Sequence, residues 1–100
     1  MNVFKWIEDW YISMCDGEWE HFYGIKIDTL DNPGWIVQID ILDTELLNKF
    51  FQTMNNYVDD NNWLHCQVSE GKFCGSGDPS KLKVILEVFK SWVENSKMTR

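Results

Sequence analysis

Arginine and proline are scarce in this 100-residue sequence, and several kinds of segment are missing altogether. There is a single Arg, at position 100, and there are two Pro and six Gly. No stretch is rich in Pro, Gly or Ser, and there are no internal repeats or low-complexity runs, which excludes a flexible linker and a repeat array. At this length we expect one domain, residues 1–100, with one modest core.

Long apolar runs and disulfide patterns are also lacking. The first 14 residues include two acidic side chains and no unbroken apolar stretch, which predicts neither a signal peptide nor a membrane span. The three cysteines, Cys15, Cys66 and Cys74, are odd in number and match no disulfide spacing. We therefore expect free thiols, a cytoplasmic protein and no membrane partner.

Motifs for cofactors and metals are absent as well. The sequence contains neither GxxxxGK[ST] nor GxGxxG, so we expect no nucleotide cofactor. Soft metal ligands occur at five positions, but no CxxC or HxxxH spacing joins them, and we expect no metal site. These positions are Cys15, His21, His65, Cys66 and Cys74.

Positive charge is in short supply. The sequence has nine Lys and Arg and sixteen Asp and Glu, which gives a net charge of −7. Such a surface repels nucleic-acid phosphates and attracts basic proteins, so we expect no nucleic-acid partner. Residues 1–60 hold twelve acidic and three basic side chains, whereas residues 61–100 hold four and six. An acidic face on the first half is therefore expected, although solubility alone would also explain it.

Aromatic residues are abundant, and with 44% hydrophobic residues they exclude a disordered chain. Apolar residues at helical spacing predict a helix over residues 3–14, with Asn2 as its cap and Gly17 beyond its end. A second helix is predicted after Asp78 as cap and Pro79 as first helical residue. Its apolar stripe comprises Leu82, Ile85, Leu86, Phe89, Trp92 and Val93.

Between the helices the apolar period changes to two, which is typical of strands. Two alternating runs, from His21 and from Trp35 to Ile41, flank a predicted type II turn with Pro33 and Gly34 at its centre. Residues 43–49 predict a loop or short helical turn, and further strands are predicted over residues 50–58, 63–69 and 72–75. The sequence thus predicts an α+β fold: a four- to five-stranded antiparallel meander with both helices packed on one face.

Two segments hold candidate catalytic groups. Cys74 lies in the string FCGSGDPS, before a predicted helix N-terminus that would lower a thiol pKa. A small Cys-dependent sulfurtransferase of the rhodanese-like kind is one interpretation, but the Arg that closes such a loop is missing. A strand running into a glycine-containing turn is the simpler one. Asp16, Glu18 and Glu20 would share one side of an extended chain, either for acid–base chemistry or as a solvated loop.

The remaining interpretation is a surface for a protein partner. Tryptophans beside carboxylates make effective interface anchors, because they bury large areas with few rotatable bonds. The candidate partner-binding residues are Asp16, Glu18, Trp19, Glu20, His21, Asp59, Asp60 and Trp63, with Trp19 as the anchor. Alternatively, these tryptophans form a second small core or cover a sheet edge. The oligomeric state, monomer or homodimer, stays open.

Three strings carry a resemblance to a known family: WIEDWY from Trp6, CDGEWEHFYGIKIDTLDNPGW from Cys15, and LEVFKSWV from Leu86. In these the chain resembles the immunity protein 53 family of bacterial proteins, which are encoded beside polymorphic toxins. The resemblance implies a cytoplasmic antidote that binds and blocks a cognate toxin, with no catalytic residues. A basic toxin would suit the acidic charge of this chain.

Overall fold

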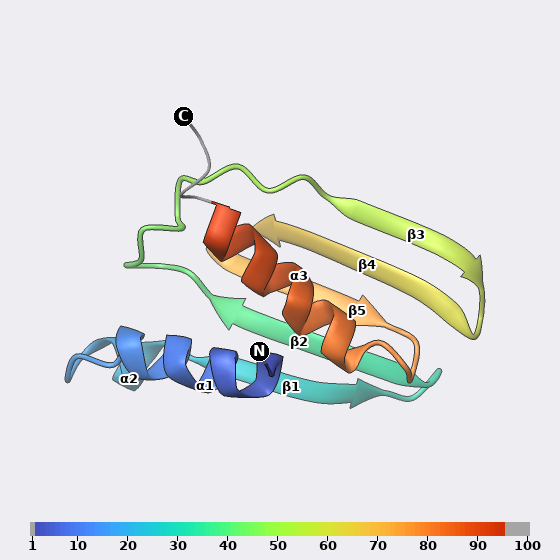
Figure 1. Cartoon of the computed structure of the whole chain (residues 1–100), viewed down its shortest axis with the longest axis horizontal. Coiled ribbons are helices and arrows are strands. Elements are labelled where there is room, and N and C mark those ends of the chain that lie inside the picture. The colour runs from blue at the N-terminus through green and yellow to red at the C-terminus, as the bar shows by residue number, and fades with distance from the viewer. Residues whose placement is uncertain (1, 96–100) are drawn as a thin grey trace.

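The computed structural model describes residues 2–95 and shows the expected α+β fold, with one antiparallel sheet and helices near both ends (Figure 1). Within residues 2–95 no helix is both long and apolar enough to cross a membrane. The helices are α1 (Val3–Met14), α2 (Trp19–Phe22) and α3 (Leu82–Glu94), and the strands are β1 (Ile25–Leu30), β2 (Gly34–Asp40), β3 (Met54–Asp59), β4 (Asn62–Ser69) and β5 (Lys72–Gly77).

The sheet has the strand order β1-β2-β5-β4-β3, so the prediction of a simple meander is wrong at one point. β2 pairs with β5, and not with the next strand along the chain. The connection after β2 buries Ile41 and Leu46 and carries the chain to the far edge of the sheet, from which β3, β4 and β5 return toward β2. β1 and β3 are therefore the two edge strands.

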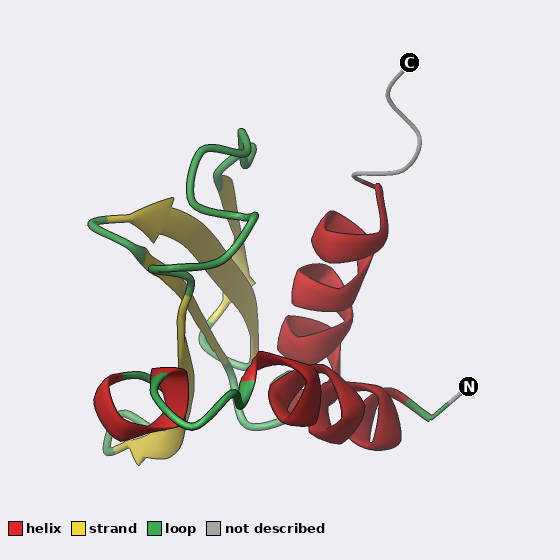
Figure 2. Cartoon of the chain, turned by 90° about the vertical axis from the view of Figure 1, so that its left-hand side faces the viewer, coloured by secondary structure: helices red, strands yellow, loops and turns green. Residues whose placement is uncertain are grey.

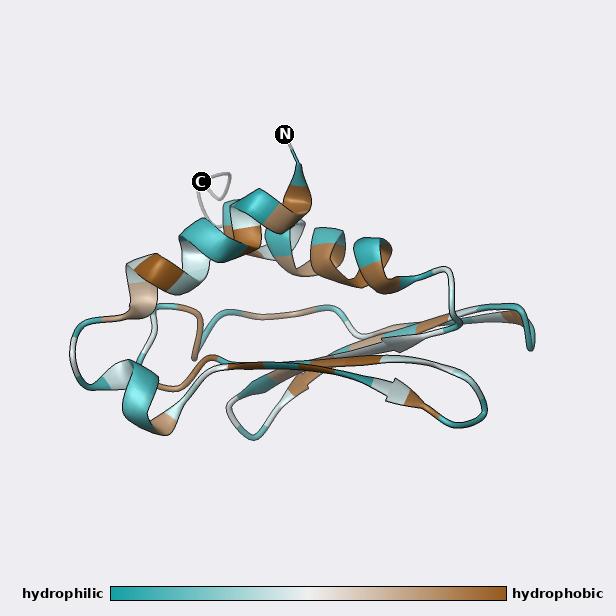
Figure 3. Cartoon of the chain, turned by 90° about the horizontal axis from the view of Figure 1, so that it is seen from below, coloured by the Kyte–Doolittle hydropathy of each residue, from teal (hydrophilic) through white to brown (hydrophobic). Residues whose placement is uncertain are grey.

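Both long helices pack on the same face of the sheet, as predicted (Figures 2 and 3). The contact is close because Gly75 has no side chain: a Cβ there would lie 2.5 Å from Cγ2 of Ile85 in α3. Since neighbouring residues of a strand point to opposite faces, Cys74 lies on the other face. This open face carries the cross-strand row Lys26, Gln38, Cys74 and Gln67.

Phe89 of α3 occupies the centre of the core. Its ring lies 5.0 Å from Trp10 of α1 and 5.2 Å from Phe73 of β5, measured between centroids, and it also packs edge-on against Trp92. Phe73 and Phe89 are fully buried. One aromatic residue thus joins both long helices to the central strand.

The β1–β2 connection differs from the predicted type II turn. Gly34 does not adopt positive φ but is the first residue of β2, opposite Leu30, and the Asn32–Pro33 peptide bond is cis. Glycine is needed at position 34 for another reason, because a Cβ there would lie 2.4 Å from the carbonyl oxygen of Gly77. By contrast, Gly17 does adopt the positive φ expected beyond the end of α1.

The limits of β3, β5 and α3 also differ from the predicted ones. β3 begins at Met54 and not at residue 50, because the preceding segment is held by α3: Lys49 Nζ donates to the Trp92 carbonyl, and Trp92 Nε1 donates to the Phe50 carbonyl at 2.8 Å. β5 continues to Gly77, and α3 begins at Leu82 with Lys81 as its N-cap residue. Pro79 therefore precedes the helix.

Asp78 does not cap α3 but is a buried junction between β4 and the turn before α3. Its side chain is 1% exposed. Its carboxylate accepts hydrogen bonds from the N–H groups of Trp63 and Ser80, each at 2.8 Å, and pairs with Lys81 Nζ at 2.6 Å. Burial alone would raise the pKa of Asp78, but these donors and the Ser80 hydroxyl outweigh it and hold the pKa well below its usual range.

Replacing this carboxylate should lower stability in a pH-dependent way. Because the folded pKa lies below the unfolded value of about 3.9, the contribution is complete above about pH 4 and declines as the pH falls further. Asp78→Asn should lower the thermal midpoint by several degrees at pH 7 and flatten its acid dependence. Asp31→Asn, at an exposed turn, is the matched control. Equal midpoints for both variants between pH 2 and 7 would contradict this role.

Candidate partner-binding surface

The structure separates the candidate partner-binding residues into two groups. Asp16 to His21 lie at α2, next to the start of β1, whereas Asp59, Asp60 and Trp63 lie at the β3–β4 turn. These two places are at opposite ends of the longest axis (Figure 1). The two groups therefore do not form one patch.

Trp19 is a core residue and not an exposed anchor. It is 5% exposed, packs edge-on against Trp10 with ring centroids 6.1 Å apart, and donates from Nε1 to the Leu42 carbonyl at 3.0 Å. The chain is helical at this point and not extended, which turns the indole inward. Of the two interpretations open from the sequence, the structure favours the one that places Trp19 in the core.

The carboxylates beside Trp19 shape the turn that begins α2. Asp16 Oδ1 accepts from the N–H groups of Glu18 and Trp19 at 3.0 and 2.9 Å, and the Glu20 carboxylate accepts from the N–H groups of Asp16 and Gly17. The bonds from Trp19 and Glu18 lower the pKa of Asp16. The extended row of three carboxylates expected for acid–base chemistry is therefore not formed. Within residues 2–95, the Glu18 carboxylate has no hydrogen-bond or ion-pair partner, and Glu18 is exposed to solvent.

Phe22 is an exposed aromatic residue of α2 that was not among the predicted partner-binding residues. It is 78% exposed and lies between two hollows that both include Tyr23. The smaller hollow, of about 200 Å³, is lined by Asp16, Glu18 and Asp43 among others. Three aromatics within five residues at α2 were a usable signal, because a single helical turn cannot direct all of them into the core.

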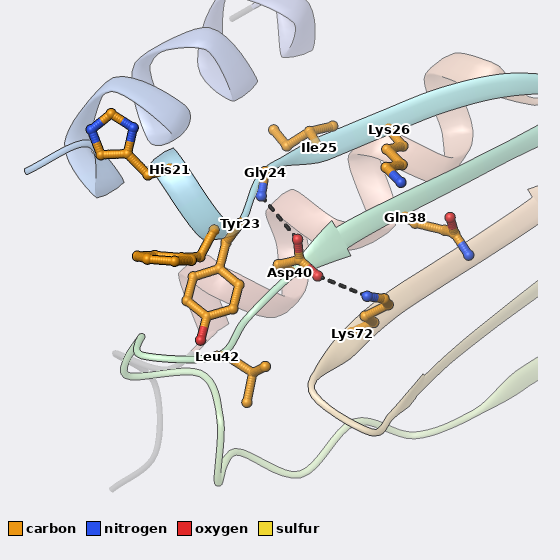
Figure 4. A pocket seen from close by; sticks show the side chains of 10 residues that line it. His21, Tyr23, Gly24, Ile25, Lys26, Gln38, Asp40, Leu42 and Lys72 are labelled. Carbon is orange, nitrogen blue, oxygen red and sulfur yellow. Dashed lines mark hydrogen bonds and ion pairs between the residues drawn. The ribbon is translucent and has the colours of Figure 1, made fainter. Parts of the chain in front are cut away.

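The larger hollow, of about 420 Å³, lies beside α2 at the end of the open face (Figure 4). Asp40 lines this hollow and makes two contacts there. One carboxylate oxygen accepts from the Gly24 N–H at 2.9 Å, and the other pairs with Lys72 Nζ at 3.1 Å. Lys26 also lines it. Phe22 therefore separates an acidic hollow from one of mixed charge. We call this region the α2 surface: Asp16, Glu18, His21, Phe22, Tyr23 and Asp43.

The second group has local partners. Asp59 accepts from the Asn61 N–H at 2.8 Å, and Asp60 accepts from the Tyr57 hydroxyl. Trp63 is half-buried, with its backbone N–H bonded to Asp78. These contacts shape the β3–β4 turn, and Asp59 and Asp60 remain exposed.

Cys74 is not placed like an activated nucleophile. It lies within β5 on the open face, between Gln38 and Gln67, and burial raises the pKa of its thiol. The lowered pKa expected from a helix N-terminus is therefore wrong. Cys66 is fully buried, and burial raises its pKa to about 12. Among residues 2–95, no three His, Cys, Asp or Glu side chains form a group that could hold a metal ion.

A comparison with known families gives one match. The family model described as immunity protein 53 matches residues 4–94. The chain belongs to the immunity protein 53 family. The match runs from the second residue of α1 to the last residue of α3. It supports an immunity role, a non-enzymatic one, in which the partner is a cognate toxin. No curated protein and no solved structure matches the chain.

Trp19 and Phe22 should differ sharply in their effect on stability. Trp19→Ala removes a buried ring and its hydrogen bond, and should cost about 3–5 kcal/mol of unfolding free energy. Phe22→Ala removes an exposed ring and should change it by less than about 0.5 kcal/mol. Urea denaturation followed by circular dichroism measures both. Similar losses for the two variants would show that Phe22 is packed in solution.

Cys74 should react slowly with alkylating reagents. Because its pKa is raised, only a small thiolate fraction is present at neutral pH. Iodoacetamide at pH 7.5 should modify it more slowly than free glutathione, as followed by mass spectrometry of peptides. A rate above that of glutathione, or thiosulfate:cyanide transfer abolished by Cys74→Ser, would contradict this assignment.

Proposed function

We propose that this protein acts in the cytoplasm as a stoichiometric antidote, which binds a cognate toxin and blocks its activity. The family match over residues 4–94 carries this proposal. The raised thiol pKa of Cys74 and the use of Asp16 and Glu20 in the α2 turn add support, because they leave the candidate catalytic groups of the sequence without activation.

The α2 surface is the proposed contact. Phe22 offers an exposed ring of the kind that anchors protein interfaces, and it stands between two hollows that a partner's side chains can enter. Glu18, Asp16 and Asp43 place negative charge around the smaller hollow. A basic toxin would be steered to this end of the molecule, and its cationic side chains would complement these carboxylates.

Co-expression tests the function directly. Cells that produce the toxin encoded beside this protein should survive when the protein is present, and the purified pair should form a complex of fixed stoichiometry by calorimetry. Toxin that stays fully active in a saturated mixture would contradict neutralisation by binding.

Two substitutions test the surface. Phe22→Ala should raise the dissociation rate and weaken toxin binding by about 10- to 100-fold, because the anchor is lost. Glu18→Lys should mainly slow association and reduce its dependence on salt. Asp31→Lys makes the same charge change at the β1–β2 turn, at the other end of the sheet, and serves as control. Surface plasmon resonance at two salt concentrations measures all three.

If Asp31→Lys slows association as much as Glu18→Lys, the overall charge steers the toxin and the α2 surface does not. If Phe22→Ala binds like the unaltered protein while neutralisation persists, the toxin contacts another surface.

A further inference from the structure

The two edges of the sheet differ in their protection against pairing with another strand. β1 carries two charged residues, Lys26 and Asp28, which oppose the approach of a further strand. β3 has no proline, and its one charged residue, Asp59, is its last. Its register with β4 is regular from Met54 to Tyr57 and shifts between Tyr57 and Asp59. No strand among residues 2–95 pairs with its outer edge. The uncharged, unpaired stretch from Met54 to Val58 is a template for strand addition.

Apolar and aromatic side chains of β3 are also left in solvent. Val58 is 70% exposed and Tyr57 is 65% exposed. Tyr57 pairs across the strands with Trp63, so its ring lies at the border of the open face. An added strand would cover both side chains and supply partners for the outward backbone groups.

The distribution of charge indicates which molecule would pair with the β3 edge. The acidic residues of α1, α2 and the α2 surface lie on the β1 side, whereas β3 is four strands away, or roughly 19 Å at the usual strand spacing. That exceeds the screening length of about 8 Å at physiological salt. A basic toxin is drawn to the β1 side. At the β3 edge, repulsion between two copies of this chain is confined to Asp59 and Asp60, at the β3–β4 turn.

The sequence of β3 also fits pairing with itself. Antiparallel pairing of two copies about a twofold axis requires that facing residues lie on the same side of the sheet. With Asn56 opposite Asn56 of the other copy, Asn55 faces Tyr57, and both residues lie in the part of β3 whose register with β4 is regular. Because this part has no acidic residue, no carboxylate faces another carboxylate there.

We propose that β3 pairs with β3 of a second copy, so that two five-stranded sheets form one continuous antiparallel sheet. Such an interface is smaller than the roughly 1,200 Å² of a standard stable one, so the dimer is weak and forms at high concentration. It leaves both α2 surfaces at the outer sides of the dimer. The pairing does not depend on the proposed antidote role.

Sedimentation velocity between about 10 µM and 1 mM protein in roughly 0.5 M NaCl, a range chosen for a weak interface, tests the proposal. The unaltered protein should pass from monomer to dimer over this concentration range. Val58→Lys should weaken dimerisation at least about tenfold by charging the edge. Thr29→Lys adds the same charge to the exposed β1 edge and should leave it unchanged. Both variants make the chain less acidic by the same amount. A loss of dimerisation that is confined to Val58→Lys therefore reflects the charge placed at the β3 edge and not a change in overall repulsion.

A second pair of variants controls for effects of misfolding. Asn56→Asp should weaken the dimer because it places two carboxylates opposite each other, whereas Asn48→Asp, in an exposed loop, should not. Thermal midpoints of all four variants show that each is folded. A protein that stays monomeric to 1 mM, or equal effects within either pair, would overturn the proposal. A β3 edge that binds only the toxin would overturn it as well.

Discussion

A chain of aromatic contacts positions the proposed binding surface. Phe89 of α3 packs against Trp10 of α1, Trp10 packs against Trp19 of α2, and the indole N–H of Trp19 is bonded to the Leu42 carbonyl after β2. α2 has four residues and could not hold its shape by helix propensity alone. Its orientation, and with it the exposure of Phe22, depends on this buried tryptophan.

The carboxylates of the first half serve two purposes. Asp16 and Glu20 hold the turn before α2, and Asp40 bonds the Gly24 N–H and pairs with Lys72. Glu18 has no such role and remains open to solvent. The acidity of the chain is thus partly structural. The exposed carboxylates of Glu18 and Asp43 lie at the α2 end, and those of Asp59 and Asp60 lie at the β3–β4 turn.

Local signals predicted the elements whose residues contact their own neighbours in the chain. The apolar spacing of α1, its Asn2 cap and the pairing of β1 with β2 were correct, and the family was recognisable from its strings. The first alternating run was predicted to start at His21, but β1 begins at Ile25 because His21 belongs to α2. Prediction was wrong at residues whose role depends on contacts with segments that are distant in the sequence. Asp78 resembled a helix cap but serves β4 through the Trp63 N–H, and Gly34 resembled a turn glycine but makes room for Gly77.

The sequence by itself determined one α+β unit, its acidic charge, its unpaired thiols and its family. Those properties depend on composition, periodicity and short strings, which need no knowledge of contacts across the fold. The tertiary structure alone decided that β5 lies beside β2, that Trp19 is buried while Phe22 is exposed, and that β1 and β3 are the two edges of the sheet. Those outcomes depend on which segments pack into the same core. Contacts between residues far apart in the chain determine that packing.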